Sequence, residues 1–214
     1  MRLTKYNHAT VVLEQDDVTI VIDPGTFTPE SAELVRGATA VLVTHEHFDH
    51  LDTDALRAGL DAAPELRAYV PEGVADQIGG DHDGRVVTVG AGDTFTVGTV
   101  EVRVFGETHA VIHPDIPTIP NVGYLVDGIV FHPGDAYLVP GVAVPTLLMP
   151  TSGPWSHMQE AVDYVREVRP ERAIQIHELL LSEPGQQSTV QFLGADGLGG
   201  VPMSILPVGE SVEL

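Results

Sequence analysis

Short apolar runs rich in Val, Ile and Thr recur along the first half of the chain, and this pattern predicts β-strands. The expected strands are Thr10–Glu14, Thr19–Ile22, Ala40–Val43, Arg67–Val70, Val86–Val89, Thr94–Val97 and Val100–Phe105. Asp16-Asp17 indicates a turn between the first two strands, and Asp23-Pro24-Gly25 ends the second.

The second half of the chain continues the same pattern. Strands are expected at Gly123–Val126, Ile129–Phe131, Val144–Met149 and Ala173–Ile176. Asp127-Gly128 separates the first two of these strands, and this dipeptide is typical of a tight hairpin turn.

Helices are predicted where apolar residues return every three or four positions. The first half has two candidates, Glu30–Arg36 and Thr53–Leu60, the second with Asp52 as its N-cap. In the second half, Ser156-His157-Met158-Gln159 has the form of a capping box, and a helix is expected from there to Val168. Val190–Leu193 is a shorter helical candidate.

Two strand-rich halves that each carry helices favour a fold of the α/β (α+β) class, with two sheets face to face and helices outside. The 214 residues fit one domain, 1–214, and no linker or literal repeat divides them. Residues 106–121 form the longest irregular stretch, and a loop of that length is usually functional or disordered.

The composition narrows the class of protein. Hydrophobic residues make up 43% and charged residues 19%, which disfavours a disordered chain. The formal net charge of −21, with one lysine and no basic run, disfavours a nucleic-acid partner, so a small-molecule substrate is expected. There is no cysteine, so any metal ion must be held by His, Asp or Glu.

No apolar run has the length of a membrane helix, and the first residues lack the apolar core of a secretory signal. We therefore expect a soluble protein in the cytoplasm with no membrane partner. The oligomeric state is left open by the sequence.

The segment His45-Glu46-His47-Phe48-Asp49-His50 directly follows an expected strand. Side chains two apart on an extended segment point the same way, so His45 and His47 can share one metal ion. Asp49 and His50 come as the chain turns toward the next helix, and they can face a second ion. Imidazole and carboxylate donors suit zinc, and they also suit manganese or iron.

Further candidate ligands lie downstream at expected strand ends. His109 and His113 follow the strand that ends at Phe105, Asp135 follows the strand Ile129–Phe131, and His177 ends the last one. His109 and His113 compete for the same role, and His109 is favoured because it comes first after its strand.

With these residues the chain resembles the metallo-β-lactamase superfamily of hydrolases. The resemblance rests on the His-x-His-x-Asp-His segment at 45–50, the later His, the Gly-Asp pair at 134–135 and His177, in matching order across nearly the whole chain. Ile22-Asp23-Pro24 is similar to the family's structural aspartate. His8-Ala9-Thr10 resembles the branch that includes L-ascorbate-6-phosphate lactonase, although this motif is shorter.

The resemblance implies a four-layer αββα sandwich and a dinuclear zinc site. His45, His47 and His109 would hold the first ion, while Asp49, His50 and His177 would hold the second. Asp135 would bridge both ions, opposite a bridging hydroxide that acts as nucleophile on a lactone, ester or phosphoester. Asp49 could also help to move a proton to the leaving group.

Three further histidines, His8, His113 and His132, are candidates for contact with the substrate; for His8 and His132 a structural role is at least equally expected. Alternative functions are a metal-dependent nuclease, a non-catalytic metal-binding protein of the same fold, and a redox protein resembling the flavodiiron proteins. The acidic charge argues against the first, the complete ligand set against the second, and the short chain against the third.

Overall fold

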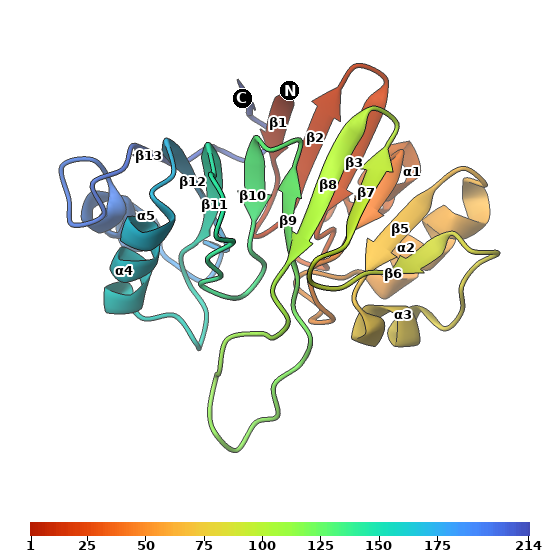
Figure 1. Cartoon of the computed structure of the whole chain (residues 1–214), viewed down its shortest axis with the longest axis horizontal. Helices are drawn as coiled ribbons and strands as arrows, with labels where there is room; N and C mark the ends of the chain where they lie inside the picture. The colour runs from red at the N-terminus through yellow and green to blue at the C-terminus, as the bar shows by residue number, and fades with distance from the viewer.

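Two seven-stranded sheets form the centre of the molecule in the computed structural model, which describes residues 1–214 (Figure 1). The first sheet has the order β14 (Ser211–Glu213), β1 (Arg2–Lys5), β2 (Val11–Gln15), β3 (Val18–Ile22), β4 (Ala40–Leu42), β5 (Arg67–Val70) and β6 (Val86–Thr88). The second has the order β13 (Met203–Ser204), β12 (Arg172–Ile176), β11 (Thr146–Pro150), β10 (Val130–His132), β9 (Gly123–Val126), β8 (Val100–Phe105) and β7 (Thr94–Val97).

Both sheets are mixed in the same way. In the first, the pairings from β14 to β3 are antiparallel and those from β3 to β6 are parallel. In the second, the pairings from β7 to β10 are antiparallel and those from β10 to β13 are parallel. Because β8 and β10 both run antiparallel to β9, they end at the same edge of the sheet as β11 and β12.

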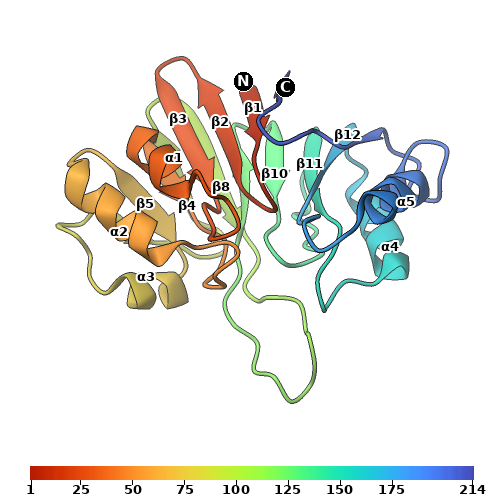
Figure 2. The same cartoon turned by 180° about the vertical axis from the view of Figure 1, so that it is seen from behind.

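Helices cover the outer face of each sheet (Figure 2). The first sheet carries α1 (Ser31–Gly37), α2 (Thr53–Ala62) and α3 (Glu72–Ile78), and the second carries α4 (Met158–Val168) and α5 (Glu183–Leu193). The prediction of an α/β sandwich with two inner sheets and outer helices is therefore confirmed. None of the helices is both long enough and apolar enough to cross a membrane.

Three apolar clusters hold these layers together. The largest lies between the sheets, and the alternation of strand side chains explains it: Leu13 and Ile20 point into it, while Val12 and Val21 belong to the cluster under the helices of the first sheet. The third cluster packs the second sheet against α4 and α5, with Val165 as a central residue.

The sequence located most elements within one or two residues, including α2 with its cap, where Asp52 accepts a hydrogen bond from the Ala55 amide. The predicted capping box at Ser156 is wrong, because His157 is the N-cap residue and makes no side-chain cap, while Ser156 Oγ hydrogen-bonds Tyr137. Helix α5 begins seven residues earlier than expected, and β1, α3, β13 and β14 were not predicted.

The ends of β8 and β9 open into the longest connection, residues 106–122, which projects beyond the strands on the side away from the two chain termini (Figure 1). The connections that follow β4, β10 and β12 hold the remaining candidate ligands. The fold therefore gathers the predicted residues at one edge of the two sheets.

Candidate metal centre

Two groups of donors lie side by side at this edge. The first consists of His45, His47, His109 and Asp135, and the second of His8, Asp49, His50 and His177. Within each group one donor atom per residue lies within 4.8 Å of every other. Side chains from five separate segments of the chain thus converge on a space of a few ångströms.

Asp135 stands between the two groups, with one carboxylate oxygen toward each. Its Oδ2 lies 3.4 Å from His109 Nε2 and 4.0 Å from His45 Nε2. Its Oδ1 lies 3.1 Å from both His50 Nε2 and His177 Nε2. This is the position that the sequence assigned to a bridging carboxylate.

The local chain direction explains why His45 and His50 face the same space. Asp23, at the end of β3, accepts hydrogen bonds from the Thr44 amide (2.7 Å) and the Thr44 hydroxyl (2.8 Å), which holds the chain as it leaves β4. The same carboxylate lies 2.6 Å from His50 Nδ1. One buried aspartate therefore anchors both ends of the histidine segment.

These and similar contacts also determine which nitrogen of each imidazole carries the proton. Thr44 Oγ1 gives its only proton to Asp23, so it accepts from His45 Nδ1 at 3.0 Å. His50 Nδ1 donates to the Asp23 carboxylate, and His109 Nδ1 donates to the Ala110 carbonyl oxygen at 2.6 Å. In the neutral form, each of these rings then presents the lone pair of Nε2 to the centre, which is the arrangement that metal-binding histidines use.

Several of the donor atoms are buried without a hydrogen-bond partner. They are His50 Nε2, His109 Nε2, His177 Nε2 and Asp135 Oδ1. Buried polar atoms are nearly always paired, and leaving one unpaired costs about 1–3 kcal/mol. Because these atoms all face one another, a bound cation would satisfy them together, so the donor set fits a metal site.

The charges of the centre shift its pKa values in opposite directions. Burial raises the pKa of Asp135, but the charges of His50 and His177 outweigh burial and hold it well below its usual range. Burial lowers the pKa of His50, and the carboxylates of Asp135 and Asp23 outweigh that effect and raise it well above the ordinary value. Without an ion, protonated imidazoles therefore balance the buried carboxylates.

His8 belongs to the centre, although its role was left undecided by the sequence. Its side chain is fully buried, and its ring centroid lies 3.8 Å from that of His177. Burial lowers the pKa of His8 to about 4, so the ring is neutral near pH 7. Its Nε2 lies 3.1 Å from Asp49 Oδ2, and because a carboxylate only accepts, Nε2 carries the proton.

The structure separates the two candidates for the third histidine. His109 is buried among the donors, whereas the side chain of His113 is 61% exposed and accepts a hydrogen bond from the Asp115 amide. The structure thus brings His109 and not His113 to the cluster. The exposed position of His113 on the outer part of the long loop also leaves it outside the cavity over the cluster.

The expectation that His132 contacts substrate does not fit the structure. The ring is fully buried, its Nε2 donates to the Ala9 carbonyl oxygen at 2.9 Å, and its Nδ1 accepts from the Gly134 amide. Both nitrogens are thus used within the protein, and His132 ties the turn before Asp135 to the strand region near His8.

Sequence reasoning missed part of the support around Asp135. The Asn121 side chain accepts from the Asp135 amide at 3.0 Å and donates to the Pro133 carbonyl oxygen, and no local signal marked it. Trp155 Nε1 donates to Asp135 Oδ2 at 3.0 Å. This tryptophan is buried beside the donors, where it is both a wall of the site and a hydrogen-bond donor.

A cavity of about 290 Å³ opens directly over the donors. It is lined by His47, Asp49, His109, Asp135 and His177 and by a set of apolar side chains from five segments. Solvent-accessible space beside buried donors of this kind is where a substrate can meet a bound ion.

Comparison with known proteins agrees with this geometry. The model of the family described as "Beta-lactamase superfamily domain" matches residues 2–177. Protein Rv0786c of Mycobacterium tuberculosis is 39% identical over 187 residues, covering 85% of this chain and 86% of that protein. A UPF0173 metal-dependent hydrolase of Aeropyrum pernix is 29% identical over 200 residues, covering 82% of this chain and 81% of that protein.

A solved structure shares the fold over the full length. Igni18, a metallo hydrolase of Ignicoccus hospitalis, superposes with a TM-score of 0.74 at 20% identity, covering 99% of this chain and 97% of that one. The chain belongs to the beta-lactamase superfamily.

Proposed function

We propose that this protein hydrolyses a small-molecule lactone, ester or phosphoester with two metal ions, for which zinc is the expected metal. The observation that carries the proposal is the placement of Asp135, whose two oxygens each face a separate group of imidazoles with buried, unpartnered nitrogens. A single-ion site would not need a carboxylate that divides the donors in this way.

The donors divide between the two ions as the superfamily resemblance implies. One ion would be held by His45, His47 and His109, the other by Asp49, His50 and His177, with Asp135 shared. Bound zinc lowers the pKa of water to about 7 and polarises the carbonyl or phosphoryl oxygen under attack. N/O donors of this kind also admit manganese or iron.

Asp49 is the donor best placed to handle a proton. Burial raises its pKa, but the imidazole of His177, whose Nε2 lies 3.6 Å away, and the hydrogen bond from His8 outweigh burial, so the carboxyl stays ionised. It lines the cavity, and its side chain keeps 16% of its surface exposed. We assign to it the acceptance of a proton from the attacking water and the transfer of that proton to the leaving oxygen of the substrate.

A small-molecule substrate is favoured over a nucleic acid. None of the ten Lys and Arg side chains lines the cavity over the donors, and the formal net charge is −21. Nucleic acids are held mainly by such cations. Measuring RNA binding at low salt checks this assignment, and tight binding would contradict it.

The proposal is tested by metal analysis and a substrate panel. The purified protein, loaded with zinc or manganese, should hold two ions per chain and hydrolyse at least one of a lactone, a carboxylic ester, a thioester and a phosphodiester. Well under one ion per chain, with no turnover after loading, would overturn the proposal. The narrower resemblance to L-ascorbate-6-phosphate lactonase makes a phosphorylated sugar lactone part of this panel.

Two histidines of the long loop provide a matched pair of variants. His109→Ala should lower the metal content toward one ion per chain and abolish most of the activity, because it removes a buried donor. His113→Ala removes an exposed ring near the same cavity and should leave both unchanged. The reverse result would show that the loop rearranges to place His113 among the ligands.

A further inference from the structure

The cavity over the donors has an apolar wall. Apart from the donors themselves, its lining side chains are Phe27, Phe48, Ile112, Pro154, Trp155 and Leu180. The rings of Phe27 and Phe48 meet edge to face with centroids 5.4 Å apart, and Phe27 also packs on His8. These residues come from five different connections, so several separate segments build the apolar wall beside the donors.

Two of these apolar side chains are largely exposed to solvent. Phe48 and Leu180 each keep 62% of their surface accessible, although exposed large apolar side chains bring no stability in water. Both stand at the rim of the cavity. Apolar side chains that line a concave site and remain exposed are typical of a surface that binds an apolar ligand.

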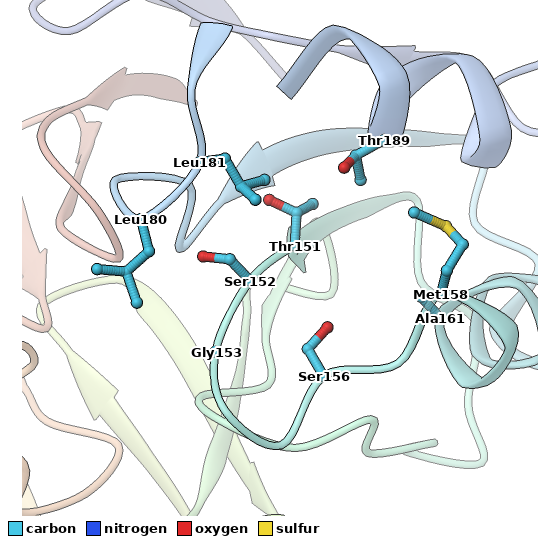
Figure 3. Close-up of a pocket in the computed structure, with 9 residues that line it drawn as sticks. All are labelled: Thr151, Ser152, Gly153, Ser156, Met158, Ala161, Leu180, Leu181 and Thr189. Atoms are coloured by element: carbon cyan, nitrogen blue, oxygen red, sulfur yellow. The ribbon is translucent and has the colours of Figure 1, made fainter. Parts of the chain in front are cut away.

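A second cavity, of about 380 Å³, adjoins the first and carries no charge at all. Leu180 lines both cavities, and the segment 151–156 contributes Pro154 and Trp155 to the first and Ser152 and Ser156 to the second. Figure 3 shows Leu181 and Met158 approaching this second cavity from different sides, with only hydroxyl groups as polar atoms between them. The space beyond Leu180 is therefore also built for an uncharged group.

A phosphorylated or carboxylated substrate lacks a partner here. Enzymes hold the oxygens of a phosphoryl group with Arg, Lys or metal ions, and no Lys or Arg lines either cavity. Beyond the two ions, an anionic group would have to leave water for an apolar wall, which is unfavourable without a paired charge.

We propose that the substrate is an uncharged carboxylic ester or lactone with an apolar group of several carbons, which packs on Phe48, Trp155 and Leu180 while its carbonyl meets the donors. Water adds to the carbonyl carbon, the acyl C–O bond breaks, and the products are a carboxylic acid and an alcohol. This inference rests on the proposed hydrolytic function and narrows it by excluding phosphoesters.

The first test compares esters that release the same product. With metal-loaded protein, kcat/KM should be at least about tenfold higher for p-nitrophenyl hexanoate than for p-nitrophenyl acetate, because the longer acyl chain buries several more CH₂ groups. p-Nitrophenyl phosphate should not be hydrolysed. Turnover of the phosphate at a rate equal to or above that of the hexanoate, or equal values for the two acyl chains, would overturn the inference while the hydrolytic function stands.

A second readout does not require turnover. Trp155 is the only tryptophan of the chain and lines the cavity, so its fluorescence reports occupancy directly. Hexanamide should give a saturable change at a lower concentration than acetamide, and hexyl phosphate should give none on the metal-free protein. If no ester were hydrolysed, the proposed function would fail, but this titration would still test whether the cavity binds an apolar group. The absence of a saturable change with hexanamide would overturn the apolar site.

Matched variants test which side chains bind the apolar group of the substrate. Phe48→Ala and Leu180→Ala should each raise the KM for the hexanoate ester about fivefold and change that for the acetate little. Phe192→Ala and Leu198→Ala remove exposed apolar side chains that line neither cavity, and both should behave like the parent protein. Phe48→Lys should shift the preference toward p-nitrophenyl phosphate. An unchanged KM in both rim variants would contradict the inference.

Discussion

Thr44 connects the structural aspartate to the first histidine of the centre. Its hydroxyl donates to Asp23 and accepts from His45 Nδ1, so one small side chain sets the tautomer of a ligand. Valine has the same shape but cannot do either. We expect Thr44→Val to weaken metal binding about 10- to 100-fold, the usual loss when the partner of a ligand is removed.

Competition with a chromogenic chelator measures this loss. Thr39→Val is the control, because the Thr39 hydroxyl accepts a hydrogen bond from the Thr19 amide at an exposed position outside the centre. Metal affinity that is unchanged in Thr44→Val would mean that Asp23 and the backbone alone orient His45.

His8 offers a second prediction at the scale of one residue. Its Nε2–H group donates to Asp49 Oδ2, and Asp49 belongs to the second group of donors and is our candidate for proton transfer. His8→Ala should therefore lower kcat and weaken the second ion about tenfold or more, while His8→Gln should restore part of both because it returns an N–H donor. Metal titration with the kcat and KM of each variant separates this role from a general loss of folding.

If His8 were instead a direct ligand, the glutamine variant would bind the second ion as weakly as the alanine variant. The sequence left His8 equally divided between a structural and a functional role, and only the fold brings its ring against His177, which lies far along the chain.

At the scale of elements, the sequence predicted what depends on neighbouring residues. Helix α4 was located because its apolar spacing continues without interruption to Val168, and the donors at 45–50 were found because they are adjacent in the chain. The start of α5 was missed because Pro184 and Gly185 interrupt the pattern, although Ser182 caps the helix there. Strand β14 pairs only with β1, at the other end of the chain, so no local pattern marks it.

The turn after β10 shows how the backbone at the end of a strand positions the donor Asp135. Gly134 has φ +66° and a Cβ at this position would lie 2.2 Å from Asn121 Oδ1, the atom that accepts from the Asp135 amide. Gly134→Ala should therefore cost about 3 kcal/mol or more of stability and displace Asp135, since it combines backbone strain with a clash in a buried network. Thermal unfolding and metal content both report this change.

Gly128 provides the control for the same substitution. It lies in the β9–β10 turn with φ +65°, and a Cβ there would meet no atom within 4 Å. Gly128→Ala should cost only about 1 kcal/mol, the price of the left-handed backbone, with metal content unchanged. An equal loss in the two variants would show that strain, and not the clash with Asn121, decides the effect at Gly134.

At the scale of the whole molecule, folding brings together carboxylates whose negative charges repel one another. The formal net charge is −21, yet Asp23 and Asp135 are buried and Asp49 is nearly so, within the same centre. In the absence of metal, the protons on His50 and His177 are the cations that compensate these charges. Metal ions and protons therefore compete for one set of buried donors.

This competition predicts how stability changes with pH. Burial lowers the pKa values of His50 and His177, but the carboxylate of Asp135 outweighs burial and raises both above the value of about 6.5 expected in the unfolded chain. A raised pKa gives stability that is fully present below about pH 6.5 and is lost as the pH rises through the folded value. In the metal-free protein, loss of these two protons should therefore lower the Tm from pH 6 to pH 8.5, whereas His8, His45, His47 and His132, whose pKa values burial lowers, favour the higher pH.

Zinc should reverse this trend, because it takes the place of the protons and binds more tightly when the imidazoles are deprotonated. The increase in Tm on adding zinc to chelator-treated protein should grow from pH 6 to pH 8.5 at constant ionic strength, where exposed charges are equally screened. Asp135→Asn removes the carboxylate that raises both imidazole pKa values, so its metal-free Tm should fall less, or rise more, from pH 6 to pH 8.5 than that of the parent protein. The same change of Tm with pH in the two proteins would show that protons on His50 and His177 do not hold the metal-free centre together.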